Sequence, residues 1–371
     1  MRDELQDVVD EVARLLGAPA TLEDRDFTLL AFAAHPLDDA ATAMDDVRTR
    51  SILGRSSTPA TRRWFEDLGI ARAEGPLRTP ADPAAGILTR LLLPVRHEGR
   101  TLGYLWLLDG GRTDPDAAAD PALAAAMEGA ARAGRLLARL REDDDLAAAL
   151  AALLTGSPAE RERAGAALAG RFDGAAVALV ALRPAGGAPL QDRHVPRGAA
   201  VLEGPDGRGE AAVAVRLSRA ADPRAAVPAA TAALARLPAG STAGVATAAT
   251  VVADLPGRWA QARAAAAVAA VVPRLAPAAA WADLGGWRVA AALPAPDPLV
   301  DPLLAEPALA ATAEAYLDAA GSVARTSAVL SVHRQTLYYR LGRITALTGL
   351  DLADGDTRLL VHASLRRARL P

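Results

Sequence analysis

The sequence predicts an α+β protein of several domains. Its 371 residues are more than one domain usually holds. Short apolar runs typical of strands alternate with helical patterns up to about residue 300, whereas residues 301–371 show helical patterns alone. We therefore expect one α/β domain over 1–112, a second over 156–300 and an all-α domain over 301–371, with a connecting helix over 113–155.

The composition indicates a globular protein that packs through small side chains. Hydrophobic residues make up 51% of the chain and aromatic residues only 4%, since alanine supplies much of the apolar content. The sequence contains no Cys, which excludes disulfides and thiolate metal sites. No apolar run has the length of a membrane span, and the first residues are charged and amphipathic, unlike a signal peptide. We expect a cytoplasmic protein with no membrane partner.

Residues 1–112 begin with a helix whose apolar side carries Leu5, Val9 and Val12. A strand pair is expected over 18–35, with its turn at 23–26, and a second over 90–109, with its turn at 97–100. This order of elements resembles a GAF-like sensor domain, which implies a pocket for a small effector on one face of the sheet. The aromatic residues that would line such a pocket, or would simply fill the core, are Phe27, Phe32, Trp64, Phe65, Tyr104 and Trp106.

Residues 113–155 predict one long helix, rich in Ala, Leu and Arg. Its acidic run at 142–145 could suggest a metal site. Consecutive helical positions point in different directions, however, so a solvated charge run fits better than a chelate. An amphipathic helix in this place could pack against a copy of itself, which makes a homodimer or a higher homo-oligomer an expectation.

Residues 156–300 contain strand-like runs at 175–184, 199–204 and 210–219. Their alternation with helical patterns predicts a mixed sheet with packed helices. Residues 243–269 resemble part of a degenerate GGDEF-like domain. The cyclase motif Gly-Gly-Asp/Glu-Glu-Phe is missing, and the strands carry no paired acids for Mg²⁺, so we expect a structural or regulatory role.

The sequence shows no catalytic constellation. The five histidines, which include His35 and His333, have no metal-ligand spacing. The glycine-rich pieces at 185–188 and 204–207 lack the Lys-Ser/Thr of a phosphate-binding loop and are typical of turns. We expect no enzyme activity, no catalytic residue, no metal and no cofactor.

Residues 321–349 predict two short helices joined by a tight turn. Ser322 can cap the first helix, which runs over 323–330. The turn falls near Ser331, and the second helix begins at about His333. This second helix carries Leu337, Leu341 and Ile344 at i, i+4 and i+7, which places them on one apolar face.

The other side chains of the second helix suit the major groove of DNA. At about 100° per residue, Gln335, Tyr339 and Gly342 lie opposite the apolar face, with Arg334 and Tyr338 on one flank. Gln can bond bidentately to adenine and Arg to guanine, while flanking groups hold phosphates. The residues that we expect to contact double-stranded DNA are Arg325, Thr326, His333, Arg334, Gln335, Thr336, Tyr338, Tyr339, Arg340 and Arg343.

Local charge favours the same interpretation. The whole chain has a formal charge of −3, but residues 323–346 contain four Arg and no acid. The alternative is an ordinary helical hairpin with solvated arginines. The short first helix, the tight turn and the polar, aromatic second helix occur together, which favours DNA binding.

The run VARTSAVLSVHRQTLYYRLGRITALTGLDL at 323–352 resembles the C-terminal helix-turn-helix of the PucR/CdaR family of bacterial transcription regulators. Upstream LAATAEAYLDAAGS and downstream DTRLLVHASLRRA match in kind and order. The family usually has His-Arg-Asn-Thr-Leu where this chain has Gln335 in third place. The resemblance implies an effector-responsive regulator. The alternatives are a nucleotide-binding or enzymatic signalling protein built on the middle domain, and a sensor-adaptor whose C-terminal helices bind protein.

Overall fold

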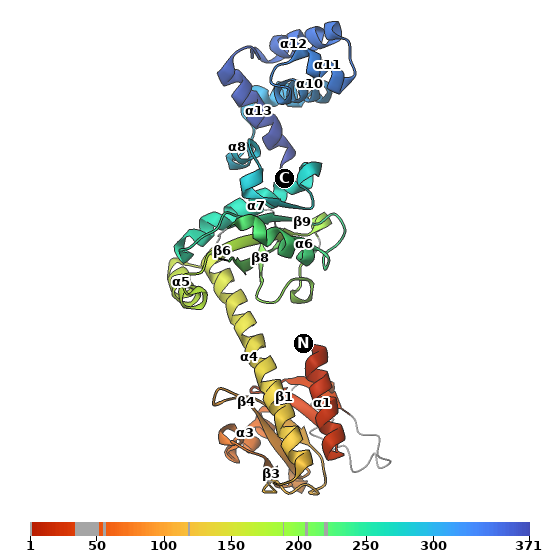
Figure 1. Cartoon of the computed structure of the whole chain (residues 1–371), viewed down its shortest axis with the longest axis vertical. Coiled ribbons are helices and arrows are strands. Elements are labelled where there is room, and N and C mark those ends of the chain that lie inside the picture. The colour runs from red at the N-terminus through yellow and green to blue at the C-terminus, as the bar shows by residue number, and fades with distance from the viewer. Residues whose placement is uncertain are drawn as a thin grey trace. The chain divides into compact units, whose positions relative to one another are not determined.

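A computed structural model describes residues 2–33, 52–54, 57–117, 119–187, 189–204, 207–218 and 222–371. His35, part of the 204–207 turn and the end of the predicted 210–219 strand lie outside these residues. The chain divides into two compact units, Met1–Glu142 and Asp143–Pro371. Each unit contains a five-stranded sheet, and the chain ends in helices, so the mixed α+β class is confirmed (Figure 1).

The sheet of the first unit is antiparallel and has the order β2-β1-β5-β4-β3. Both predicted hairpins are present. The second closes through Glu98 and Gly99, whose φ values of 45° and 76° are those of a two-residue hairpin turn. The first closes over 24–28 rather than 23–26, because Asp24 Oδ1 accepts hydrogen bonds from the amides of Asp26 and Thr28. The strands are β1 (Ala20–Asp24), β2 (Leu29–Ala33), β3 (Leu77–Thr79), β4 (Arg90–His97) and β5 (Arg100–Leu107).

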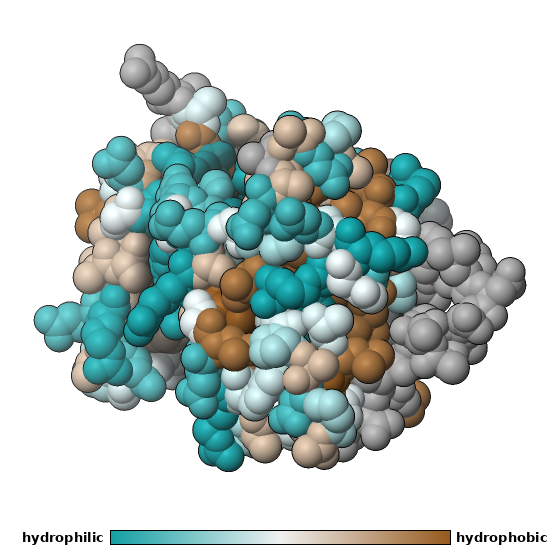
Figure 2. Space-filling model, turned by 90° about the horizontal axis from the view of Figure 1, so that it is seen from below, coloured by the Kyte–Doolittle hydropathy of each residue, from teal (hydrophilic) through white to brown (hydrophobic). Residues whose placement is uncertain are grey.

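Helices cover this sheet on both faces. Side chains alternate along β4, so that Leu91 and Leu93 face α1 (Arg2–Leu16) and the first part of α4 (Pro121–Thr155). Leu92 faces the other way, toward α3 (Pro59–Asp67) and the 3-10 turn Ile70–Arg72. The helix α4 occupies most of residues 113–155, the segment predicted to form one connecting helix. In the view from below, apolar side chains form small patches beside polar ones (Figure 2).

The sheet of the second unit is mixed, as the sequence predicted. Its order is β10-β9-β6-β8-β7, and only β9 and β10 run parallel. Three of its strands coincide with the three strand-like runs of the sequence. The strands are β6 (Val177–Arg183), β7 (Ala200–Glu203), β8 (Gly209–Arg216), β9 (Thr242–Val245) and β10 (Ala278–Ala280).

Two layers of helix enclose this second sheet. The helices α5 (Pro158–Phe172) and α7 (Leu255–Val271) lie on one face, and α6 (Val227–Leu234) lies on the other. Strand β9 and α7 approach each other closely at Gly244. A Cβ atom at this position would lie 2.0 Å from the carbonyl oxygen of Ala262 and 2.2 Å from the amide nitrogen of Ala266. The contact therefore requires glycine.

The C-terminal part is entirely helical. One buried cluster, which includes Val300, Leu317, Ile344 and Val361, holds its helices together. The end of the chain also contacts elements that precede these helices. Leu370 packs with Trp287, and Arg369 Nη2 donates a hydrogen bond to the carbonyl of Val271 at 2.9 Å. The helices are α8 (Trp287–Ala292), α9 (Asp301–Leu304), α10 (Pro307–Asp318), α11 (Val323–Leu330), α12 (Arg334–Thr348) and α13 (Gly355–Arg369). None of the helices in the described ranges is long and apolar enough to span a membrane.

Candidate nucleic-acid interface

The tight turn between α11 and α12 lies where the sequence places it. Ser322 Oγ accepts a hydrogen bond from the Arg325 amide at 3.4 Å and caps α11. Ser331 ends α11 with a φ of 54°, in the left-handed region. This conformation reverses the chain within two residues, and the amide of Val332 bonds back to the carbonyl of Ser327 at 3.0 Å.

His333 is the N-terminal cap of α12. Its Nδ1 accepts a hydrogen bond from the Gln335 amide at 3.3 Å. In the neutral ring the proton must therefore be on Nε2, which leaves an N–H donor at the exposed start of the helix. The sequence indicated a phosphate contact for His333 but not this capping role, because His is an uncommon cap.

Packing decides which side of α12 meets solvent. Leu337 and Ile344 are fully buried, and Leu341 packs against the same cluster. Tyr338 is 59% exposed and Tyr339 69% exposed, although aromatic rings are normally buried. The apolar face predicted from the sequence is therefore the buried face. The exposed predicted contacts at the interface are Arg325, His333, Arg334, Gln335, Thr336, Tyr338, Tyr339 and Arg343.

Two predicted DNA contacts need correction. Thr326 is fully buried, and its hydroxyl donates to the carbonyl of Ser322 at 2.8 Å, so it belongs to the packing of α11. Arg340 is half-buried, and its Nη1 donates to Thr312 Oγ1 on α10 at 3.2 Å. Helical angles could place Arg340 on a flank but could not show that α10 lies beside that flank.

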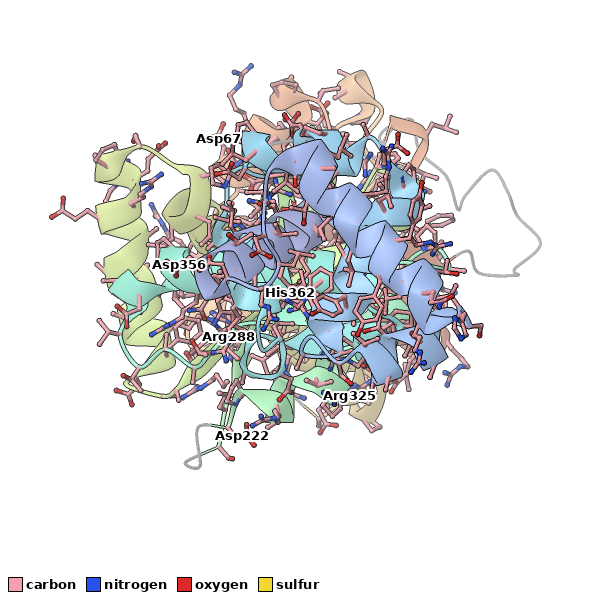
Figure 3. The ribbon with its side chains drawn as sticks, turned by 90° about the horizontal axis from the view of Figure 1, so that it is seen from above. Asp67, Asp222, Arg288, Arg325, Asp356 and His362 are labelled. Carbon is pink, nitrogen blue, oxygen red and sulfur yellow. The ribbon has the colours of Figure 1, made fainter. Side chains whose placement is uncertain are left out.

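The electrostatics of this surface favour an anion. Among the residues that the structure describes, no carboxylate forms an ion pair with any of the four arginines of 323–346. Arg325, labelled in Figure 3, donates from Nη2 to the carbonyl of Ala319 at 2.7 Å, which fixes its guanidinium near the end of α10. The amides at the start of α12 and its helix dipole add positive potential. Phosphate groups are the complement of such a surface.

The predicted effector residues of the first unit pack against one another. The ring centroids of Phe65 and Trp106 are 4.5 Å apart, and those of Phe27 and Tyr104 are 5.5 Å apart. Trp64 joins this aromatic cluster through an edge contact with Phe65. Burial raises the pKa of Tyr104. Phe32, by contrast, is 45% exposed on the edge strand β2.

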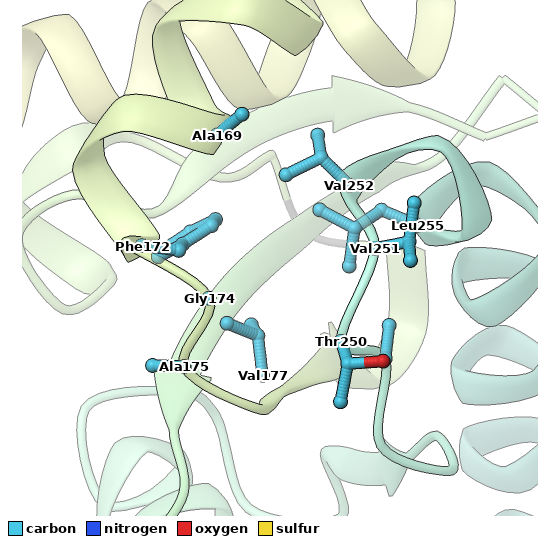
Figure 4. A pocket seen from close by; sticks show the side chains of 10 residues that line it. Ala169, Phe172, Gly174, Ala175, Val177, Thr250, Val251, Val252 and Leu255 are labelled. Carbon is cyan, nitrogen blue, oxygen red and sulfur yellow. The ribbon is translucent and has the colours of Figure 1, made fainter.

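A small apolar hollow lies in the second unit, at the end of α5. It has a volume of about 200 Å³ and is enclosed by Phe172, Val177, Val252 and Leu255 (Figure 4). Its lining offers one side-chain hydroxyl, on Thr250, and no charged group. Such a hollow lacks the convergent polar groups of a specific ligand site. In the described part of the chain, no group of three His, Asp or Glu side chains could hold a metal ion.

Comparison with known proteins finds similarity in the C-terminal helices. Residues 309–367 match the family of the PucR C-terminal helix-turn-helix domain. The chain is 26% identical over 118 residues to the DNA-binding transcriptional activator AdeR of Bacillus subtilis (strain 168), a match to 31% of this chain and 27% of that protein. It is 56% identical over 41 residues to the carbohydrate diacid regulator of Escherichia coli (strain K12), a match to 11% of each chain.

These matches cover less than a third of either relative, so they describe the C-terminal part rather than the whole protein. Among solved structures, the regulator of polyketide synthase expression from Bifidobacterium adolescentis aligns with 62% of this chain and 94% of its own, at 16% identity. Its TM-score of 0.24 is too low to bear on the fold.

Proposed function

Because residues 309–367 form a helix-turn-helix domain of the PucR type, we propose that this protein is a DNA-binding transcription regulator that reads DNA with α12. The observation that carries the proposal is the division of α12 into two faces. Leu337 and Ile344 are buried, whereas Gln335, Tyr339 and Arg343 are exposed, and the segment 323–346 contains no acidic residue. A helix divided in this way can enter the major groove with its polar side toward the bases.

The exposed residues have different roles in this proposal. Arg334 and Gln335, in the first turn of α12, contact base edges, since the N-terminal residues of a recognition helix lie deepest in the groove. Arg343, two turns further on, contacts phosphate, and so do the Nε2–H of His333 and the hydroxyl of Thr336. Arg325 supports the backbone contacts from α11. Phosphate contacts fix the register, and base contacts select the sequence.

The rest of the chain is proposed to control this DNA-binding domain. Residues 1–112 act as a GAF-like sensor, 156–300 as a GGDEF-like regulatory domain and 301–371 as the DNA-binding domain, in a cytoplasmic protein. In each unit helices cover both faces of the sheet, which supports these assignments. A homodimer, formed through α4, would place one helix-turn-helix on each half-site. Exposed arginines such as Arg135 and Arg139 leave one face of α4 open to solvent.

Selection of bound sites from random duplexes, followed by titration at several salt concentrations, tests the proposal. Because each protomer is proposed to make several arginine–phosphate contacts, raising the salt concentration from 50 to 200 mM should weaken binding by roughly a hundredfold or more. The double variant Arg334→Ala/Arg343→Ala should bind far more weakly than wild type. The matched control is Arg161→Ala/Arg163→Ala, which removes the same charge from exposed positions on α5.

Equal binding by both double variants would overturn the proposal. So would a failure of the full-length protein to enrich any sequence at low salt. An adaptor that binds protein through its C-terminal helices would give that second result.

A further inference from the structure

A second concave site lies in the second unit, and no residue of α12 lines it. Its volume is about 280 Å³, and it is formed where α8 meets the helices α10 and α13. The end of α10 contributes Leu317, the turn that follows it contributes Gly321, and α8 contributes Val289. From α13 come Arg358, Leu359 and His362. His362 is labelled in Figure 3.

The cations around this pocket exceed the acids. Arg366 Nη2 donates to Asp318 Oδ1 at 2.7 Å, and the same oxygen lies 2.9 Å from His362 Nε2. Arg369 forms its own ion pair with Glu314 at 2.7 Å. Asp318 and Glu314 therefore balance Arg366 and Arg369, while burial lowers the pKa of His362 and disfavours its charged form. Among the residues that the structure describes, Arg358 has no counter-ion.

Arg358 is held in place without an acidic partner. Its Nε donates to the carbonyl of Leu352 at 2.5 Å, and its guanidinium carbon lies 6.0 Å from the centre of the Tyr316 ring. Among the described residues no carboxylate forms an ion pair with it, although its side chain is half-buried. Arg358 lines the pocket, and its Nη2 would lie 3.0 Å from a Cβ atom placed on Gly321. A bound anion would give this guanidinium the charged partner that it lacks among the described residues.

The remainder of the lining is apolar. Leu359 is 63% exposed and Val289 51% exposed, so two large aliphatic side chains lie open beside the arginine. Leu317, Ala320 and Ala363 continue the apolar wall. An inorganic ion would leave this wall in contact with water. A carbon skeleton of a few atoms would cover it while its acid group reaches Arg358.

We propose that this pocket binds a small organic carboxylate, with its acid group on Arg358 and its carbon skeleton against Leu359 and Val289. Arg358 donates two parallel hydrogen bonds to the carboxylate oxygens. Because residues of α8 and of α10 and α13 line one pocket, occupancy favours the arrangement in which these helices close around the ligand. The part of this inference that concerns DNA affinity depends on the proposed function, whereas the binding itself does not.

Calorimetric titration of the full-length protein without DNA tests the binding. The probes are butanoate, hexanoate, benzoate and inorganic phosphate. We expect at least one carboxylate to bind saturably and phosphate not to bind. Arg358→Gln should weaken binding about tenfold or more, because it removes a charge-assisted pair, and Arg358→Lys should restore part of the affinity.

A second pair of variants keeps the test independent of folding. Leu359 is exposed, so Leu359→Glu and Leu359→Gln should both fold, with thermal melting as the check. Glu places a negative charge at the pocket and should abolish carboxylate binding, while Gln should retain it. Binding of phosphate alone, equal binding by both Leu359 variants, or no binding by any carboxylate would each overturn the proposal.

Titration with operator DNA, with and without the carboxylate, then tests the coupling. We expect the ligand to change the DNA affinity of wild type and not that of Leu359→Glu. Unchanged DNA affinity despite proven carboxylate binding would overturn the coupling alone. A protein that binds carboxylate but no DNA would contradict the proposed function and leave the pocket assignment standing.

Discussion

Arg340 on α12 donates a hydrogen bond from Nη1 to Oγ1 of Thr312 on α10, at 3.2 Å. Thr312 is fully buried, and its hydroxyl in turn donates to the carbonyl of Ala308 at 2.7 Å. The bond therefore ties α12 to α10. One of the four arginines of residues 323–346 is therefore bonded to a neighbouring helix of the same domain.

Arg340→Ala should lower the free energy of unfolding of the C-terminal domain by about 1–2 kcal/mol, since it removes a hydrogen bond from a charged donor to a buried hydroxyl. Arg343→Ala removes the same kind of side chain from an exposed position and should leave that free energy nearly unchanged. Urea denaturation of the two variants, followed by circular dichroism, measures the difference. Identical stability losses would contradict the distinction between the two arginines.

Arg334→Ala and Gln335→Ala should each change which sequences are preferred, at a cost of about 1–3 kcal/mol on the best site. Arg343→Ala should weaken binding to all sequences alike, because a phosphate carries no sequence information. Affinities for a selected site and for random duplex, measured by fluorescence anisotropy, separate the two effects. The assignment of roles fails if all three variants lose equal affinity on both duplexes.

Gly342→Ala should stabilise the protein and weaken its binding to DNA. A Cβ at this exposed position meets no atom within 4 Å, and alanine favours a helix over glycine by about 1 kcal/mol. The added methyl would nevertheless stand on the face that approaches the duplex. Thermal melting and DNA titration of the same sample measure both changes. Unchanged affinity would show that the backbone at 342 stays clear of the DNA.

Gly244→Ala should have the opposite effect on stability. Its Cβ would overlap the backbone of α7 at 2.0 and 2.2 Å, and backbone atoms cannot rotate away as a side chain can. Overpacking of this kind costs about 1–3 kcal/mol or more and should separate α7 from the sheet. Limited proteolysis of the second unit, with Gly342→Ala as the matched control, reports the damage. A variant as resistant as wild type would contradict the close packing of β9 and α7.

The first unit should lose stability in acid through Asp109. Burial alone would raise the pKa of this carboxyl, but hydrogen bonds from Arg78 and from the amides of Thr113 and Gly111 outweigh it and lower the pKa to about 2. The unfolded value is 3.8. Because the pKa is lower in the folded state, the ionised carboxylate stabilises the unit fully at pH values above 3.8. This stabilisation is lost as the pH falls from 3.8 through about 2.

That contribution should be about 2 kcal/mol. Urea unfolding at pH 6, 4 and 2.5 would reveal it as a loss of stability in wild type. Asp109→Asn should be less stable at pH 6 and should show a smaller decline toward acid. Parallel declines in the two proteins would exclude Asp109 as the titrating group.

The sequence was most informative where a feature depends on residues close together in the chain. The cap at Ser322, the turn at Ser331 and the start of α12 depend on local hydrogen bonds and dihedral angles, so a few letters predict them. The hairpin over 90–107 was likewise predicted from two apolar runs and the Glu98-Gly99 turn. The aromatic residues were harder to interpret, because ligand pockets and cores use the same side chains.

By itself, the sequence determined the helix-turn-helix and placed Leu337 and Ile344 on the inner face of its second helix. The spacing of apolar residues along the chain is enough to predict which side of a helix is buried. Only the tertiary structure decided that Thr326 is buried, that Arg340 bonds to Thr312 and that Arg358 lines a pocket. Each of these depends on which distant helix lies beside the residue. The packing of whole helices against one another sets that neighbour, and spacing along one helix does not.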